Sequence, residues 1–224
     1  MYSETGSECK DIFLPIFKDS LKNGNCPICT ILGNYEVNIL ESILYERVND
    51  PEVRRKFIDS MGLCKYHAWL IVELSERSTL VDNLGPSLLY RDILAKYIRD
   101  GHSSKKGTCP ICRDVASYEK MIVKWIAKCM DNSDWFRSLY ANGKAVFCDN
   151  HYHRIIGQMR NPHAIKEFES IHRDKLKSIL IRIESYISKK DYRSKEEIKE
   201  EEVYAWIDAL KALKGDRSFR GCSG

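Results

Sequence analysis

The sequence predicts an all-α fold: an internally duplicated helical bundle in which each half is organised around a metal site of three cysteines and one histidine. Three observations favour this fold. Apolar residues recur at steps of three and four positions over most of the chain, which is the spacing of one helix face. No alternating strand pattern or Asn-Gly hairpin signal stands out. One pattern of cysteine and histidine occurs twice at matched spacing.

Two long helices are predicted to begin at the two Cys-Pro-Ile-Cys motifs. Apolar residues follow a helical period from Ile28 to Leu44 after the first motif and from Ile111 to Cys129 after the second. Proline is favoured in the first turn of a helix, where its missing N–H group costs no hydrogen bond. Each motif is therefore expected to open a helix.

The other helices are predicted from caps and breakers. Asn49-Asp50-Pro51 is expected to cap and start a short helix that Gly62 ends. Further helices are expected at each distal cysteine–histidine pair, over Leu84–Ile98, from Asn161-Pro162 to about Tyr186, and near Glu196–Leu213. The last helix is expected to gather its apolar residues on one side, namely Val203, Trp206, Ile207 and Leu210.

Composition indicates a soluble globular protein. The 224 residues are enough to bury a core, and 43% hydrophobic with 30% charged residues is ordinary for such proteins. No window reaches the roughly 18 unbroken apolar residues of a spanning helix, and the first residues lack the clean apolar run of a signal peptide. We therefore expect a cytoplasmic protein without a membrane partner. A net charge of +4 does not by itself require a nucleic-acid partner.

Nine cysteines are the most informative feature of the composition, because in a reducing compartment they favour metal or redox chemistry over disulfides. Cys26 and Cys29 are followed after 34 residues by Cys64 and His67. In the same way, Cys109 and Cys112 are followed after 35 residues by Cys148 and His151. The flanks repeat too, with Tyr35 and Tyr118 each nine residues after their first cysteine. The chain thus divides into a tail (1–10), a first repeat (11–100), a second repeat (101–190) and a C-terminal amphipathic helix and tail (191–224).

Each repeat supplies the residues of a closed zinc site. Two cysteines three positions apart at a helix start direct both sulfurs to one ion, and the free N–H groups of the first turn stabilise thiolates. A second pair, cysteine and histidine three apart, completes four tetrahedral ligands. We expect two zinc ions per chain, each bound within its own repeat. The expected metal ligands are Cys26, Cys29, Cys64 and His67 for the first ion, and Cys109, Cys112, Cys148 and His151 for the second.

Two rival interpretations of the cysteines stay open. An iron–sulfur cluster can also be held by three cysteines and one histidine, and the sequence does not separate it cleanly from zinc. Thiol redox chemistry by the Cys-x-x-Cys motifs is the other, although it does not explain the distal cysteine–histidine pairs. Haem attachment is disfavoured because Thr30 and Arg113, not histidines, follow the two motifs.

The remaining cysteines and histidines have no partner in the duplication. Cys129 is interpreted as a core residue, and Cys9 and Cys222 as terminal residues without a role. Asp92 and Asp174, in matching Arg-Asp pairs, are candidates for carboxylates that orient the ligating histidines. His153 could replace His151 as a ligand, but the first repeat has Trp69 at the equivalent position.

Motifs along the whole chain resemble those of the prokaryotic proteins grouped as domain of unknown function 6062. The shared features are the two Cys-Pro-Ile-Cys motifs, the stretch 44–51, the segment 62–67, the run 89–92 and the distal pair Cys148 and His151, followed by 190–193 and Ala205-Trp206. The resemblance implies a helical, cysteine-rich, metal-binding protein and carries no established activity.

A non-enzymatic role is the favoured expectation. A site with four protein ligands leaves no open position for water, and the sequence has no Gly-rich phosphate loop, nucleophile elbow or His-Glu-x-x-His helix. The leading hypothesis is a zinc-clamped helical scaffold that binds an unidentified protein partner, with nucleic acid as a weaker candidate. The alternative is a redox or electron-transfer protein using iron–sulfur clusters or thiols.

Overall fold

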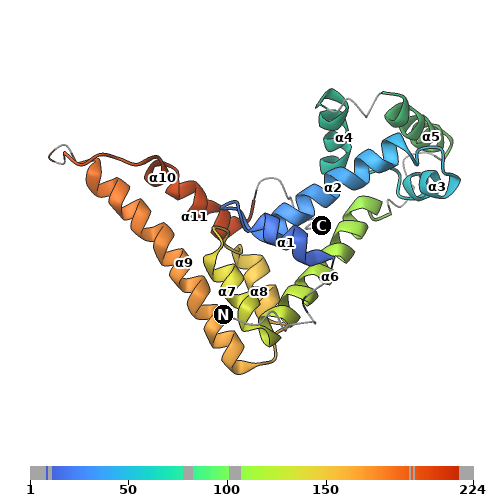
Figure 1. The fold of residues 1–224 in the computed structure, drawn as a ribbon. Coiled ribbons are helices and arrows are strands. Elements are labelled where there is room, and N and C mark those ends of the chain that lie inside the picture. The colour runs from blue at the N-terminus through green and yellow to red at the C-terminus, as the bar shows by residue number, and fades with distance from the viewer. Residues whose placement is uncertain are drawn as a thin grey trace. The chain divides into compact units, whose positions relative to one another are not determined.

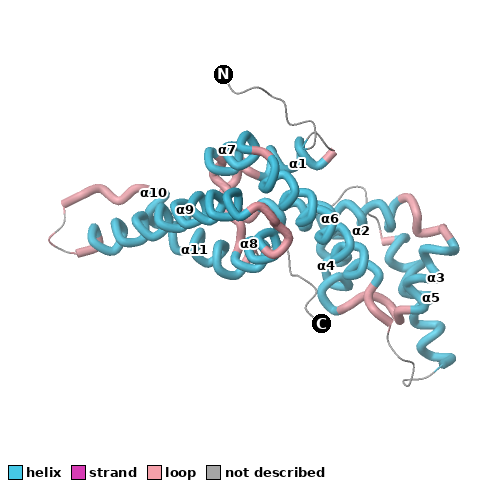
Figure 2. The backbone as a smooth tube through the Cα atoms, turned by 90° about the horizontal axis from the view of Figure 1, so that it is seen from below, coloured by secondary structure: helices cyan, strands magenta, loops and turns pink. Residues whose placement is uncertain are grey.

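The computed structural model describes residues 9, 12–77, 83–100, 107–191, 193 and 195–216. Over these residues the chain forms eleven helices and no strand, so the predicted all-α class is confirmed (Figure 2). No helix within these ranges is both long and apolar enough to cross a membrane.

The chain folds into two compact units, and neither unit is made from one repeat alone. Among the described residues, those up to 31 and those from 119 onward form unit 1, and those between 32 and 118 form unit 2. Helices α2 (Pro27–Tyr45) and α6 (Pro110–Asn132) each begin in one unit and end in the other (Figure 1). Each long helix therefore carries the chain out of the unit in which its Cys-Pro-Ile-Cys motif lies.

Helices α2 and α6 begin at the motifs, as the sequence predicts. The carbonyl oxygen of Cys26 accepts the first helical hydrogen bond, from the N–H of Thr30 at 3.0 Å. The carbonyl of Cys109 accepts the equivalent bond from Arg113 at 3.2 Å. The first cysteine of each motif is thus the N-cap residue, followed by proline at the first helical position.

Unit 2 is completed by α3 (Pro51–Asp59), α4 (Lys65–Arg77) and α5 (Leu84–Asp100). The Asp50 side chain accepts a hydrogen bond from the N–H of Glu52, which confirms the predicted cap of α3. The turn after α3 reverses the chain through Gly62, whose φ of 93° suits glycine. Helix α5 packs against α3, and at Gly85 an added Cβ would lie 2.4 Å from the carbonyl oxygen of Leu44 in α2.

Unit 1 contains α1 (Phe13–Ser20), α7 (Asp134–Asn142), α8 (Asp149–Ile156) and α9 (Pro162–Lys189). Its core is aromatic and fully buried, with ring-centroid separations of 4.8 Å between Phe17 and Phe136 and 5.9 Å between Phe147 and Phe168. Asn161 caps α9 through hydrogen bonds from two backbone N–H groups, as its Asn-Pro sequence predicts. Burial of these large rings supplies the main stabilisation of the unit.

The C-terminal helix differs from its prediction in both extent and buried face. It begins at residue 200 and is divided at Tyr204 into α10 (Glu200–Val203) and α11 (Ala205–Lys214), which lie along α9 (Figure 1). Trp206 and Leu210 are 60% and 50% exposed, whereas Ala205 and Ala212 are buried. Alanines let the backbone of α11 approach Ile179 and its neighbours on α9 closely, so the larger side chains point away.

Candidate metal centres

The eight predicted ligand residues gather into two groups of four. Within each group the candidate ligand atoms all lie within 4.8 Å of one another. The α2–α8 site consists of Cys26, Cys29, Cys148 and His151 and lies in unit 1. The α4–α6 site consists of Cys64, His67, Cys109 and Cys112 and lies in unit 2.

Each site is built where two helices begin. The carbonyl oxygens of Cys64 and Cys148 accept the first helical bonds of α4 and α8, from Ala68 at 3.0 Å and Tyr152 at 2.8 Å. The histidine then lies in the first turn, three residues after its cysteine, on the same side of the helix. Two helix N-termini consequently meet at each site, and their dipoles favour thiolates there.

In the α2–α8 site, three sulfur atoms surround one ring nitrogen. Nδ1 of His151 lies 3.4 Å from Sγ of Cys26, 3.4 Å from Sγ of Cys29 and 3.1 Å from Sγ of Cys148. The sulfurs of Cys29 and Cys148 are 3.8 Å apart. All four residues are buried.

The α4–α6 site repeats this arrangement. Nδ1 of His67 lies 3.2 Å from Sγ of Cys64, 3.6 Å from Sγ of Cys109 and 3.5 Å from Sγ of Cys112. The sulfurs of Cys64 and Cys112 are 3.6 Å apart. His67 and Cys109 are buried, whereas Cys64 and Cys112 are only partly buried.

A glutamate carboxylate contacts the second ring nitrogen, Nε2, of each histidine. Nε2 of His67 lies 2.7 Å from Glu36, and Nε2 of His151 lies 3.1 Å from Glu119. A carboxylate on Nε2 fixes the proton there and leaves Nδ1 free to face the sulfurs, as in many metal sites. Glu36 also accepts a hydrogen bond from the Tyr66 hydroxyl at 2.9 Å, whereas Glu119 is paired with the Arg154 guanidinium.

Both sites concentrate negative charge around the imidazole. Burial alone would lower the pKa of His67, but hydrogen bonds with Cys109 and Glu36 outweigh it and raise the pKa to about 10. The same balance, with Cys148, Cys29 and Glu119, raises the pKa of His151 to about 11. Burial would raise the pKa of Cys109, yet its hydrogen bonds, first with His67, lower it to about 6. In the α2–α8 site, burial and the neighbouring Cys148 and Cys29 raise the pKa of Cys26. A metal cation in either cluster would supply the positive charge that holds all the cysteines as thiolates.

Comparison with known proteins assigns the chain to a family. A model described as "Family of unknown function (DUF6062)" matches residues 10–100 and again residues 90–216. The chain belongs to the DUF6062 family. A relative described as an uncharacterized 23.9 kDa protein in the xynA 3′ region, from Caldicellulosiruptor sp. (strain Rt8B.4), is 24% identical over 207 residues. That alignment covers 88% of this chain and 98% of the relative. No solved structure matches.

The prediction that each repeat binds its own ion is wrong for this DUF6062 protein. The Cys-Pro-Ile-Cys motif of each repeat lies with the distal cysteine and histidine of the other. The reason is the length of α2, the helix that follows the first motif. Its 19 residues span about 28 Å at 1.5 Å per residue. This rise carries the chain from the site at the start of α2 into unit 2, where Cys64 and His67 meet the second motif.

The carboxylates on the histidines are also not those that the sequence indicated. Asp92 accepts hydrogen bonds from Arg54, and Asp174 lies 3.2 Å from Lys177. Glu36 and Glu119 take that role instead, and a signal for them exists in the sequence. Each stands ten residues after the first cysteine of its motif, next to the repeated tyrosine.

The other cysteines and histidines that the structure of this family member describes lie outside the two sites. Cys129 is fully buried, as predicted, and Cys9 is also buried, at 2% exposure, although its terminal position indicated no role in the fold. Cys222 lies outside the described residues. His153 is exposed and pairs with Asp149 at 3.2 Å, so it does not join His151 as a ligand.

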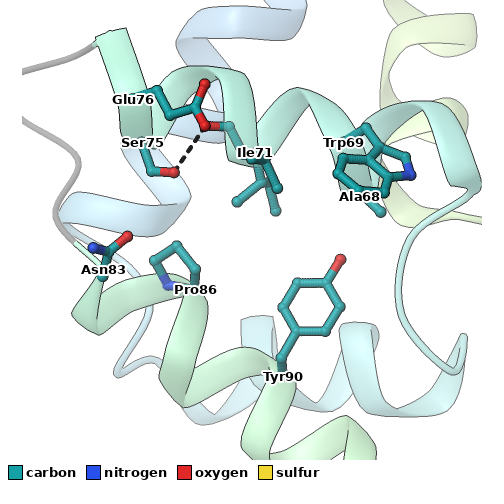
Figure 3. Close-up of a pocket in the computed structure, with 9 residues that line it drawn as sticks. Ala68, Trp69, Ile71, Ser75, Glu76, Asn83, Pro86 and Tyr90 are labelled. Carbon is teal, nitrogen blue, oxygen red and sulfur yellow. Dashed lines mark hydrogen bonds between the residues drawn. The ribbon is translucent and has the colours of Figure 1, made fainter.

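A pocket of about 610 Å³ lies between α4 and α5 of unit 2 (Figure 3). Ala68 and Trp69, which directly follow the ligand His67, line one side, and Pro86 and Tyr90 of α5 line the other (Figure 3). Burial raises the pKa of Tyr90, and negative charge on Cys109 and Cys64 raises it further.

Proposed function

We propose that the protein binds one Zn²⁺ ion in each site and that the two ions clamp a helical scaffold that binds another protein. The observation that carries this proposal is the presence of two complete sets of four ligand atoms, each set gathered around a point that a single ion can occupy. Cysteine and histidine are the ligands that structural zinc sites use.

The separations between ligand atoms support a single tetrahedral ion. Zn–S distances of about 2.3 Å and Zn–N distances of about 2.0–2.1 Å imply S···S of about 3.8 Å and S···N of about 3.5 Å. The S···S separations are 3.8 and 3.6 Å, and the S···N separations range from 3.1 to 3.6 Å. An iron–sulfur cluster spreads its ligands over several irons, which requires larger separations. This argument favours zinc over the cluster alternative.

A structural role follows from the number of ligands. Three sulfurs and one nitrogen fill a tetrahedral zinc ion and leave no position for a reacting water. Each ion would instead join two helix N-termini, α2 with α8 and α4 with α6. Because ligands in each set come from both repeats, each bound ion would also close a long loop of the chain, which reduces the entropy of the unfolded state.

Exposed aromatic side chains support a protein partner. Trp69 and Trp206 are 62% and 60% exposed, although tryptophan is normally buried in a helical protein. Tryptophan is enriched at the centres of protein interfaces. A cytoplasmic location, where thiols stay reduced, fits the metal-binding role of the cysteines.

Metal analysis of natively purified, untagged protein tests the proposal. We expect about two zinc ions per chain by elemental analysis and a colourless solution, because each site offers four ligand atoms to one ion. Removal of the zinc with a chelator should unfold part of the helical structure, measured by circular dichroism, because metal binding contributes directly to folding free energy. Folded protein that lacks metal, or a brown protein with iron and sulfide, would refute the proposal.

A further inference from the structure

The two sites differ in how well the protein covers them. All four ligand residues of the α2–α8 site are buried, and the backbone of Gly215 at the end of α11 lies against its sulfurs. A Cβ added at Gly215 would be 3.5 Å from Sγ of Cys29 and 3.7 Å from Sγ of Cys148. In the α4–α6 site, by contrast, Cys64 and Cys112 are both partly exposed.

The two sites also differ in the charge around them. In the α2–α8 site the carboxylate of Glu119 is neutralised by the guanidinium of Arg154. In the α4–α6 site the corresponding carboxylate, Glu36, accepts a hydrogen bond from the neutral Tyr66 hydroxyl instead. The negative charge around the thiolates of the α4–α6 site is therefore less compensated than that around the thiolates of the α2–α8 site. Less compensated thiolates are better electron donors.

The sulfurs of these two partly exposed residues are also close neighbours. Sγ of Cys64 and Sγ of Cys112 are 3.6 Å apart and belong to the starts of two different helices, α4 and α6. A disulfide bond of about 2.05 Å needs these atoms to approach by only about 1.5 Å. The sulfurs of Cys29 and Cys148 are similarly spaced, at 3.8 Å, so exposure and charge, rather than spacing, distinguish the two sites.

From these observations we infer that Cys64 and Cys112 form a peroxide-sensitive pair, whose oxidation to a disulfide releases the metal of the α4–α6 site and leaves the α2–α8 site intact. This inference rests on the proposed metal binding and adds a regulation to one of its two sites. The α4–α6 site then responds to peroxide, and the α2–α8 site keeps its metal and stabilises the fold under the same conditions.

The chemistry is a two-electron oxidation by hydrogen peroxide. One thiolate attacks a peroxide oxygen, the O–O bond breaks, and a sulfenic acid and hydroxide result. The second thiolate attacks that sulfur, forms the S–S bond and displaces another hydroxide. Two protons from solvent convert the hydroxides to water, so two thiolates are oxidised while one peroxide is reduced. The site is left with Cys109 and His67, too few ligands to retain the ion.

The partial exposure of Cys64 and Cys112 gives solvent access to this pair. The pocket between α4 and α5 is a neighbour in sequence, because Ala68 and Trp69, which line it, directly follow His67. A small uncharged oxidant such as hydrogen peroxide can therefore reach the neighbourhood of the sulfurs without unfolding of the unit. Reduction of the disulfide by a dithiol, followed by addition of zinc, should restore the site.

The test follows zinc release from the full-length, metal-loaded protein during treatment with hydrogen peroxide. The zinc content is measured first, so that a protein without zinc refutes the proposed function before the inference is tested. A chromophoric chelator then reports released zinc, and peptide mass spectrometry identifies the disulfide. We expect one of the two ions to leave in a fast phase, with Cys64 linked to Cys112, and the other to remain at least tenfold longer.

Two variants provide matched controls. Cys148→Ser, in the α2–α8 site, should keep the fast phase, whereas Cys64→Ser should lose it. Release of both ions at one rate, a first disulfide among Cys26, Cys29 and Cys148, or no release at all would overturn the inference. Because the disulfide is mapped in the unmodified protein, the result does not depend on whether either variant folds.

Discussion

Sγ of Cys26 lies 3.4 Å from Nδ1 of His151, a residue 125 positions further along the chain. Its nearer counterpart, His67, instead faces the cysteines of the second repeat. The two repeats thus exchange their distal ligands, and each site is complete only when both repeats are present. The rings of Tyr35 and Tyr118, equivalent residues of the two repeats, stack at 4.1 Å where α2 meets α6.

The exchange predicts which double substitutions remove one metal ion and which remove two. Cys26→Ser with Cys148→Ser damages only the α2–α8 site, so we expect about one zinc ion to remain per chain. Cys26→Ser with Cys64→Ser damages both sites, so we expect almost none. Elemental analysis of the purified variants measures the difference.

Binding within each repeat would give the opposite result. In that case Cys26→Ser with Cys64→Ser would retain one ion, and Cys26→Ser with Cys148→Ser would lose both. Cys129→Ser, at a buried position outside both sites, is a control that should keep the full metal content. The pair of double variants therefore decides between the two arrangements without a structure.

The glutamates behind the histidines are expected to tune metal affinity. Glu119→Gln should weaken zinc binding at the α2–α8 site by about 10- to 100-fold, and Glu36→Gln should do the same at the α4–α6 site. The reason is that a neutral amide holds the imidazole less firmly than the carboxylate does at 2.7 to 3.1 Å. Competition with a chelator of known affinity measures the effect, and Glu73→Gln, on the exposed side of α4, is the control.

Helix starts and ligand residues were predictable because each depends on local chemistry. Cys26 and Cys109 start helices through their own carbonyls and the following prolines, and Asp50 caps α3 through its own side chain. The pairing of the ligands was not predictable, because a spacing of 34 residues is compatible with either a return to the start of α2 or a continued path away from it. That choice depends on tertiary packing, which the repeat pattern does not encode.

The face that α11 buries was not predictable from the sequence, for a related reason. Hydrophobicity alone places Trp206 and Leu210 against the core, but Ala209 and Ala212 are the residues of α11 that pack with Ile179 of α9. Steric fit outweighs the hydrophobic gain of a larger side chain when the partner helix is near. The positions of Glu36 and Glu119 could have been found, since they match within the duplication.

Gly215 is expected to be necessary for closing the α2–α8 site. Its φ of 85° and ψ of 174° belong to a region that residues with a side chain rarely adopt. Gly215→Ala should therefore destabilise unit 1 by about 1–3 kcal/mol, measured as the free energy of unfolding. It should also speed up loss of zinc from that site to a chelator, because the backbone lies against the sulfurs. Gly24→Ala, where an added Cβ meets only the Asp208 side chain at 3.8 Å, should change neither quantity.

The pH dependence of stability should contain a contribution from His172, a buried residue of α9. Its Nδ1 lies 3.1 Å from the Tyr140 hydroxyl, and its ring stacks on Tyr152 at 4.2 Å. Burial, and after it the charge of Lys175, lowers the pKa of His172 from 6.5 to about 4. The other charged groups that act on it are Asp149, His153 and Cys148.

Because the folded pKa is below the unfolded value, the unfolded chain binds more protons than the folded chain between about pH 6.5 and pH 4. The stabilisation from the neutral imidazole is therefore present above pH 6.5 and is lost as the pH falls to 4, by up to about 3 kcal/mol. His172→Asn, which keeps an acceptor for Tyr140, should unfold with a smaller pH slope over this range. Denaturant titrations at matched metal content measure the slope, with His163→Asn at an exposed position of the same helix as the control. Equal slopes for the wild type and His172→Asn would show that His172 does not couple folding to protonation.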